Sequence, residues 1–292
     1  MLCVTIGDDD SVTDIVRLGH AAPATNTSVN QSVQQQLPKH LTLHIGDGDA
    51  LIERVTQTAR QELVLAPVEL HRRNIQRRLR EAQLPKDGLQ CTDPTAVATQ
   101  LLTVDAQPPT TLDRIDRLSM IQSICADDEA SITAPAVPAD PQGIEQIRTV
   151  IENVTGFHPD RLAVLDTVAD GLTPPLDADT ADLVAAATTI ERTLRQRAPE
   201  AVSQVESIRW ATRRILETDG EIFKQAYPDI DRISLVGVSS VAISYIDLLH
   251  AVLATVSIPV HIHLRAGTGT YLANRVSQLF DIANPGTVVF GS

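Results

Sequence analysis

Short apolar runs alternate with amphipathic segments in two separate parts of the chain. The runs are bounded by turn residues, as expected for strands of a sheet that is buried on both faces. The strand candidates are residues 41–45 (LTLHI), 63–67 (LVLAP), 89–91 (LQC), 232–238 (RISLVGV) and 259–265 (PVHIHLR). Segments with a helical period follow them, at 49–61, 68–83, 92–102, 242–256 and 269–283. Strands that alternate with helices over short loops predict a parallel α/β sheet with right-handed crossovers.

A different pattern separates these two parts. From residue 111 to about residue 227 one helical period follows another, over a length that is natural for a separate subdomain. The N-terminal residues begin with an apolar run (LCVTI) and continue into polar sequence with neither period, which indicates a flexible linker. We therefore predict an N-terminal strand, helix and linker (1–38), an α/β domain (39–110 plus 231–292) and a helical insertion subdomain (111–230).

Composition adds a strong acidic balance. The net charge is -13, with 25 Asp against 12 Glu, and only three of the 24 basic residues are lysines. Such a surface keeps a protein hydrated in high salt, which predicts a halophilic protein, although an acidic protein from a GC-rich genome gives a similar composition. In molar salt the Debye length is only about 3 Å, so the global charge does not exclude a nucleic-acid partner. Binding would then depend on local arginine contacts.

The cysteines and the apolar stretches exclude several classes of protein. The three cysteines have no CxxC spacing, which argues against a disulfide framework and a thiolate zinc site. The chain shows neither a secretory signal pattern nor an apolar stretch long enough to cross a bilayer. We therefore expect a soluble, cytoplasmic protein with no membrane partner.

The segment LTLHIGDGDALIERV (41–55) places a glycine turn between a strand and a helix, where nucleotide-binding proteins hold phosphate. A working phosphate loop continues with a lysine and a Ser/Thr, which are missing here, and a third dinucleotide-type glycine is replaced by Leu51. Two carboxylates in the turn would repel a triphosphate. We therefore expect a degenerate nucleotide loop and no cofactor, with a capped helix after any strand as the alternative; its residues are Gly46, Asp47, Gly48 and Asp49.

The order of further segments resembles the N-terminal helicase-like region of the B subunit of AddAB/RexAB-type helicase–nucleases, which belong with the superfamily 1 helicases. The matching parts are residues 63–67 with the helix after them, 111–124 and 232–264. They resemble the family's VPT-like strand end, its R-L-x-x-x-R-like helix and its hydrophobic-x-G-F strand. The resemblance covers about residues 41–283. It implies a RecA-like (P-loop NTPase-like) α/β fold, with a parallel sheet and a large all-helical insertion.

The chain departs from that family where the motor chemistry should be. The Walker A lysine is missing, and the segment SLVGVSS carries no acidic pair where a Walker B strand would bind Mg²⁺. The sequence has neither a nuclease D/E-x-K signature nor a four-cysteine iron–sulfur set. Because ATP hydrolysis needs the lysine and the magnesium carboxylates together, we expect a pseudoenzyme without catalytic residues.

Two arginine-rich segments are candidates for nucleic-acid binding. Arginine binds phosphate in a bidentate way, and tryptophan stacks on bases. The resemblance places the first segment beside a single-stranded DNA path, and helical spacing puts Arg73, Arg77 and Arg80 on one side. A solvated face that pairs with Glu69 and Glu81, or a core tryptophan, is the alternative. The candidates are His71, Arg72, Arg73, Arg77, Arg78 and Arg80 in the first segment, and Arg209, Trp210 and Arg213 in the second.

Three histidines raise the question of a metal site. His261 and His263 alternate on one strand candidate, so both point to the same face, and His44 belongs to another strand. A three-histidine metal site is conceivable. Neutral core histidines on buried strands are the interpretation that we favour, and we predict no metal site.

These observations predict a non-catalytic helicase-like protein of DNA repair or recombination. It would bind single-stranded or duplex DNA, or a helicase or nuclease subunit, without ATP hydrolysis. Two alternatives stay open: a structural interaction subunit with no DNA contact, and a Rossmann-type small-molecule enzyme with an atypical glycine loop.

Overall fold

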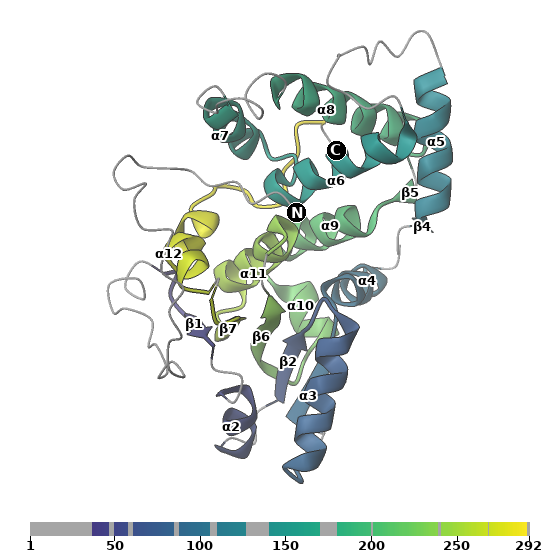
Figure 1. The fold of residues 1–292 in the computed structure, drawn as a ribbon. Coiled ribbons are helices and arrows are strands. Elements are labelled where there is room, and N and C mark those ends of the chain that lie inside the picture. The colour runs from purple at the N-terminus through teal and green to yellow at the C-terminus, as the bar shows by residue number, and fades with distance from the viewer. Residues whose placement is uncertain are drawn as a thin grey trace, which may run out of the picture.

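A five-stranded sheet forms the centre of the molecule (Figure 1). The computed structural model describes residues 37–46, 50–57, 61–84, 88–105, 110–126, 140–169, 180–199, 201–238, 241–267 and 269–290. The strands are β1 (Leu41–Ile45), β2 (Gln61–Leu65), β3 (Leu89–Thr92), β6 (Ile230–Val238) and β7 (Val260–Leu264). Their order in the sheet is β1-β7-β6-β2-β3, and every pairing is parallel. The predicted parallel α/β sheet is therefore confirmed, with β2 beginning and ending two residues earlier than expected.

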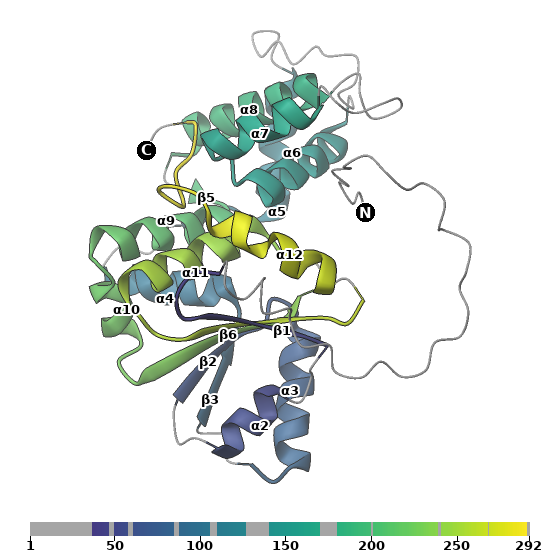
Figure 2. The ribbon, with the colours of Figure 1, turned by 90° about the vertical axis from the view of Figure 1, so that its left-hand side faces the viewer.

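Helices cover both faces of this sheet (Figure 2). The helices α2 (Ala50–Gln57) and α3 (Glu69–Glu81) lie on one face. The other face is covered by α4 (Pro94–Val104), α9 (Gln204–Glu217), α10 (Glu221–Ala226), α11 (Ile243–Thr255) and α12 (Gly269–Phe280). Alternation along each strand divides its side chains between the two layers, since neighbouring residues point to opposite faces.

The larger core lies under the second layer. Leu63 and Leu65 of β2 point into it, while Val64 between them points toward Leu51 of α2 and Leu79 of α3. The helix α4 begins as its sequence predicts, because the Asp93 side chain accepts a hydrogen bond from Ala96 N at 2.9 Å and Pro94 follows the cap. Helices α9 and α10, within the segment expected to be an insertion, contribute Ile208, Ile215 and Phe223 to this core.

Four further helices lie beyond α9 and α11, on the far side from the sheet (Figure 2). They are α5 (Arg114–Ala126), α6 (Pro141–Thr155), α7 (Pro159–Ala169) and α8 (Thr180–Arg197). Two short strands, β4 (Thr110–Thr111) and β5 (Ala201–Val202), pair in parallel at the boundary. The expectation of an all-helical insertion (111–230) is therefore wrong at residues 201–202, which form β5 before α9 begins. The segment after α12 contacts this helical part, where Val289 N donates to Phe157 O at 3.1 Å.

Buried charges join these helices to α9. Four arginines and four glutamates from α5, α6, α8 and α9 form one ion network: Arg117, Arg148, Arg195 and Arg209 with Glu145, Glu152, Glu191 and Glu206. Arg148 alone contacts Glu145, Glu152 and Glu191, at 2.7, 3.1 and 2.8 Å. The arginines and glutamates are equal in number, so the network carries no net charge.

Attraction within the ion network outweighs the desolvation of its members. Burial by itself would lower the pKa of Arg148, but the negative charges of Glu152 and Glu191 raise it above its ordinary value. Burial would likewise raise the pKa of Glu191, and Arg148 and Arg195 hold it low instead. Arg148 and Glu191 therefore stay ionised, and each depends on its partners.

Arg209 provides a test of this dependence, because its side chain is only 1% exposed. We expect Arg209→Met to reduce the free energy of unfolding by about 3–5 kcal/mol, since it removes one of the two arginines that neutralise each of the buried Glu152 and Glu206. The matched control is Arg73→Met, which removes an exposed ion pair and should cost less than about 1 kcal/mol. Denaturant unfolding of both variants in molar KCl measures the difference. Equal losses in the two variants would contradict a structural role for the ion network.

Candidate nucleic-acid interface

The carboxyl ends of all five strands lie at one edge of the sheet, where ligands bind in open α/β folds. Gly46 directly follows β1 there, with φ of 68° and its N–H donating to Leu264 O at 3.0 Å. A Cβ at this position would lie 3.3 Å from Ala266 Cβ, so a glycine fits both the backbone and the space. The predicted Asp47, Gly48 and Asp49 lie outside the described residues, and the degenerate loop stays a prediction.

His71 lies over the end of β6 at the same edge. Gly237 has a left-handed φ of 73°, and a Cβ there would be 2.0 Å from His71 Nδ1, so only glycine leaves room for the ring. Burial, and then the positive charge of Arg265, lower the pKa of His71. The side chain of Arg265 contacts the ring directly. His71 is therefore a neutral ring at neutral pH, whereas Arg265 was not predicted from the sequence and supplies the charge here.

Arg72 connects α3 to α4. Its Nη1 donates to Asp93 Oδ2 at 2.7 Å, and Asp93 also caps α4. A cavity of 470 Å³ lies beside this pair, lined by Pro67, Asp93, Thr95, Gln204 and Tyr245 among others. Burial, and then the charge of Asp93, raise the pKa of Tyr245, so its hydroxyl stays protonated. The predicted nucleic-acid role of Arg72 would require this ion pair to open.

The exposed side of α3 carries Arg73, Arg77 and Arg80, which we call the α3 ridge. Arg73 and Arg77 are 71% and 63% exposed, and they pair with Glu69 and Glu81 at 2.6 and 3.8 Å. Such exposed pairs contribute little and exchange readily for another anion. The helix holds five arginines and two glutamates, a net charge of 5 − 2 = +3, in a chain of net charge -13. Arg78 is half-buried.

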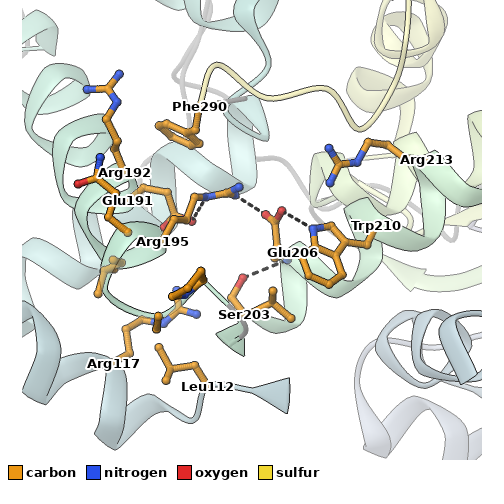
Figure 3. A pocket seen from close by; sticks show the side chains of 15 residues that line it. Leu112, Arg117, Glu191, Arg192, Arg195, Ser203, Glu206, Trp210, Arg213 and Phe290 are labelled. Atoms are coloured by element: carbon orange, nitrogen blue, oxygen red, sulfur yellow. Dashed lines mark hydrogen bonds and ion pairs between the residues drawn. The ribbon is translucent and has the colours of Figure 1, made fainter. Parts of the chain in front are cut away.

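The second predicted segment divides between core and surface. Arg209 is buried and contacts Glu152 and Gly156 O, so its predicted contact with nucleic acid is wrong: its charge is already paired inside the protein. Trp210 is half-buried, and its Nε1 donates to Glu206 Oε1 at 2.9 Å. Trp210 and Arg213 line a cavity of 410 Å³ (Figure 3).

Sequence reasoning did not find the residues that complete this cavity. Arg192 and Arg195 come from α8, and Phe290 comes from the segment after α12. The Arg195 guanidinium lies 4.8 Å from the centre of the Phe290 ring. A signal for α8 existed in the spacing of Arg192 and Arg195 by three residues, but Phe290 lies in a segment with no period.

His44, His261 and His263 lie together on the face of the sheet that α2 covers. The rings of His44 and His263 stack at 4.4 Å, and His44 Nε2 lies 3.0 Å from His261 Nδ1. Arg54 of α2 enters the group, with its guanidinium nitrogens 2.9 Å from His263 Nε2 and 3.3 Å from His44 Nε2. Among the described residues no group of three or more His, Cys, Asp or Glu side chains has the geometry of a metal site.

The Arg54 guanidinium is also held by acids and hydroxyls of the sheet. It donates to Glu62 Oε1 and to Ser234 Oγ, both at 3.1 Å. Glu62 in turn pairs with Arg232 at 3.3 Å. Burial first, and then the charge of Arg54, lower the pKa of His261 to about 3. A positive guanidinium occupies the centre that a metal ion would need.

Within the described part of the chain, none of the helices combines the length and apolarity needed to cross a bilayer.

A comparison with known families gives a match that covers most of the chain. The family model described as Halobacterial UvrD-like protein matches residues 27–291, nearly the whole chain. A search of curated proteins finds no match.

The lowered pKa of His261 predicts an acid-sensitive fold. The unfolded chain binds a proton near the ordinary value of 6.5, while the folded chain stays neutral down to about 3. The contribution of neutral His261 to the free energy of unfolding is therefore fully present above pH 6.5. It is lost as the pH falls from 6.5 toward about 3. We expect His261→Gln to flatten the dependence by up to about 1 kcal/mol per pH unit, discounted for the exposed part of the ring. Denaturant unfolding between pH 7 and about pH 5 measures this, and an unchanged slope in the variant would contradict it.

Proposed function

We propose, from the premise that this chain belongs to the family of halobacterial UvrD-like proteins, that it binds DNA as a non-catalytic, helicase-like protein of DNA repair or recombination. Its role is to hold DNA, or a complex of DNA with a helicase or nuclease subunit, without hydrolysing ATP. We further propose that the sheet is a RecA-like domain and that the helical part is an insertion in it. Among helicase-related proteins, the chain would then be most similar to the B subunit of AddAB/RexAB-type enzymes.

The α3 ridge carries the proposal. DNA binding in high salt depends on short-range contacts, because screening removes attraction beyond a few ångströms. Three exposed arginines on one helix face supply such contacts, since each guanidinium can bind a phosphate with two parallel hydrogen bonds. Among the described residues, a phosphate that binds Arg73 and Arg77 competes with the exposed ion pairs that these arginines make with Glu69 and Glu81.

The loss of motor chemistry supports a holding role. A helicase of this class couples movement to ATP hydrolysis, which requires a lysine on the phosphates and carboxylates on Mg²⁺. The sequence has no lysine after Gly46 in the turn. At its carboxyl end, β6 carries Leu235, Val236, Gly237 and Val238 where magnesium carboxylates would be expected.

A structural interaction subunit is the second candidate. The helices α6 and α7 expose Val150, Val154 and Val164, whose side chains are 50–60% exposed. Exposed apolar side chains favour protein contacts when they lie together. Under this alternative the helical part docks on a partner and the chain does not touch DNA.

Removing charge from the α3 ridge tests the proposal. We expect Arg73→Ala/Arg77→Ala to lower DNA affinity by about tenfold or more at a fixed KCl concentration. The slope of log affinity against log salt should fall by about two, because two phosphate contacts are lost. Fluorescence anisotropy with labelled single-stranded and duplex DNA, over a series of KCl concentrations, measures both quantities.

The matched control is Arg114→Ala/Arg275→Ala, which removes the same charge from α5 and α12. This variant should bind DNA as the unmodified protein does. An equal loss in both doubles would show that only net charge matters. An unmodified protein without DNA affinity would overturn the proposal and favour the interaction subunit.

A further inference from the structure

The 410 Å³ cavity beside α8 and α9 has largely apolar walls (Figure 3). The indole of Trp210 is held by its hydrogen bond to Glu206, and the Phe290 ring is held by an edge contact with Phe157 at 5.1 Å. Fixed apolar walls in a cavity of this size favour an apolar side chain as the occupant. The apolar lining includes Leu112, Leu194, Pro199, Val202, Trp210 and Phe290.

One cation of the lining is available to a carboxylate. Arg213 belongs to α9, and the segment after α12 packs on its stem, since a Cβ on Gly286 would lie 3.4 Å from Arg213 Cγ. Arg117 and Arg195 already pair with glutamates of the ion network, and the Arg192 guanidinium is directed away from the cavity (Figure 3). Among the residues that the structure describes, Arg213 has no carboxylate partner. An occupant with a carboxylate next to its apolar part would therefore match this cavity.

The first residues of the chain combine these two chemistries. Residues 2–6 (LCVTI) are apolar, and after one glycine they are followed by Asp8, Asp9 and Asp10. The family match begins at residue 27, so this segment precedes the part that the chain shares with its family. Residues 1–36 lie outside the described residues. An apolar run that is followed by polar sequence gains free energy when its side chains are buried against an apolar surface.

The length of the intervening sequence allows this segment to reach the cavity. Leu37 packs against the main core, and residues 7–36 separate it from the apolar run. A polar chain of that length spans about 30 Å on average and up to about 100 Å when extended. A tethered segment also meets the cavity at an effective concentration in the millimolar range, so that a weak affinity is sufficient.

We propose that residues 2–10 bind in this cavity as an intramolecular ligand. The apolar side chains of residues 2–6 lie against Trp210 and Phe290, and the carboxylates of residues 8–10 lie near Arg213. Charge complementarity favours this occupant, because a chain of net charge -13 repels an acidic segment over most of its surface. Contacts of this kind persist in molar salt, since apolar burial needs no long-range field. The α3 ridge lies on the opposite face of the sheet, so the inference does not rest on DNA binding (Figure 2).

Cys3 lies in the middle of the apolar run and makes the contact measurable. Gln196→Cys places a second thiol on the exposed rim of the cavity, and the matched control Gln76→Cys places one on the exposed side of α3. In the full chain, under mild oxidation in molar KCl, we expect Cys3 to form a disulfide with position 196 at least about tenfold more than with position 76, because binding raises the local concentration. Mass spectrometry of the peptides measures both bonds and separates them from bonds with Cys91 or Cys125.

Further variants of the full chain test the apolar and the charged contacts separately. Val4→Asp/Ile6→Asp should reduce the bond to position 196 by about tenfold, since it removes the apolar burial. It should also raise the quenching of Trp210 by acrylamide, which is read without interference because the chain has one tryptophan. Arg213→Gln should reduce the bond by about threefold, as expected for a partly exposed ion pair. Arg275→Gln removes an arginine from α12 and should change neither measurement.

The outcomes separate binding in the cavity from mere tethering. Equal disulfide formation at positions 196 and 76 would overturn the inference, because it would show a segment without a preferred site. Unchanged quenching of Trp210 in Val4→Asp/Ile6→Asp would overturn it as well. A disulfide-linked dimer would contradict the intramolecular contact and assign the cavity to the same segment of a second copy. None of these results bears on DNA binding by the α3 ridge, so the proposed function is tested independently.

Discussion

The buried ion network is the constraint on which the rest of the structure depends. Its members come from four helices. Each arginine contacts a carboxylate of at least one other helix. Apolar packing tolerates sliding between helices, whereas a buried charge tolerates only the geometry that satisfies it. The network therefore fixes α5, α6 and α8 on α9. Since α9 belongs to the main core, the helical part is held in register with the sheet.

The 410 Å³ cavity and the α3 ridge both depend on this arrangement of helices. Arg117 and Arg195 serve the ion network and line the cavity at the same time, so the frame of the cavity cannot shift independently. The α3 ridge depends on the other layer, where α3 packs through Leu79 and leaves its arginines to solvent. The exposed arginines of α3 thus lie on a helix that core contacts hold in place, in a chain that is strongly acidic overall. That placement suits recognition in salt that screens long-range fields.

The elements that could be predicted from the sequence are those that depend on local signals. Short apolar runs marked the five strands of the sheet, a helical period over residues 92–102 marked α4, and helical spacing placed the α3 ridge on one exposed side. The ion network could not be predicted in this way, because the pairs that join its helices, such as Arg148 with Glu191 and Arg209 with Glu152, are far apart in sequence. Arg209 and Arg213 differ by one helical turn, yet the first is buried and the second lines a cavity. The positions of Glu152, Glu206 and the carbonyl of Gly156 in the folded chain decide between them.

The strand order also constrains the path by which the molecule forms. The first strand, β1, pairs with β7 alone, and contacts such as that of His44 with His261 join residues 217 positions apart. Closing so long a loop costs entropy that no local contact repays, so such pairing comes late in folding. During synthesis β1 has no strand to pair with until β7, the last strand of the sheet in sequence, has been synthesised. The interval exposes an open sheet edge that a chaperone or a second chain could occupy.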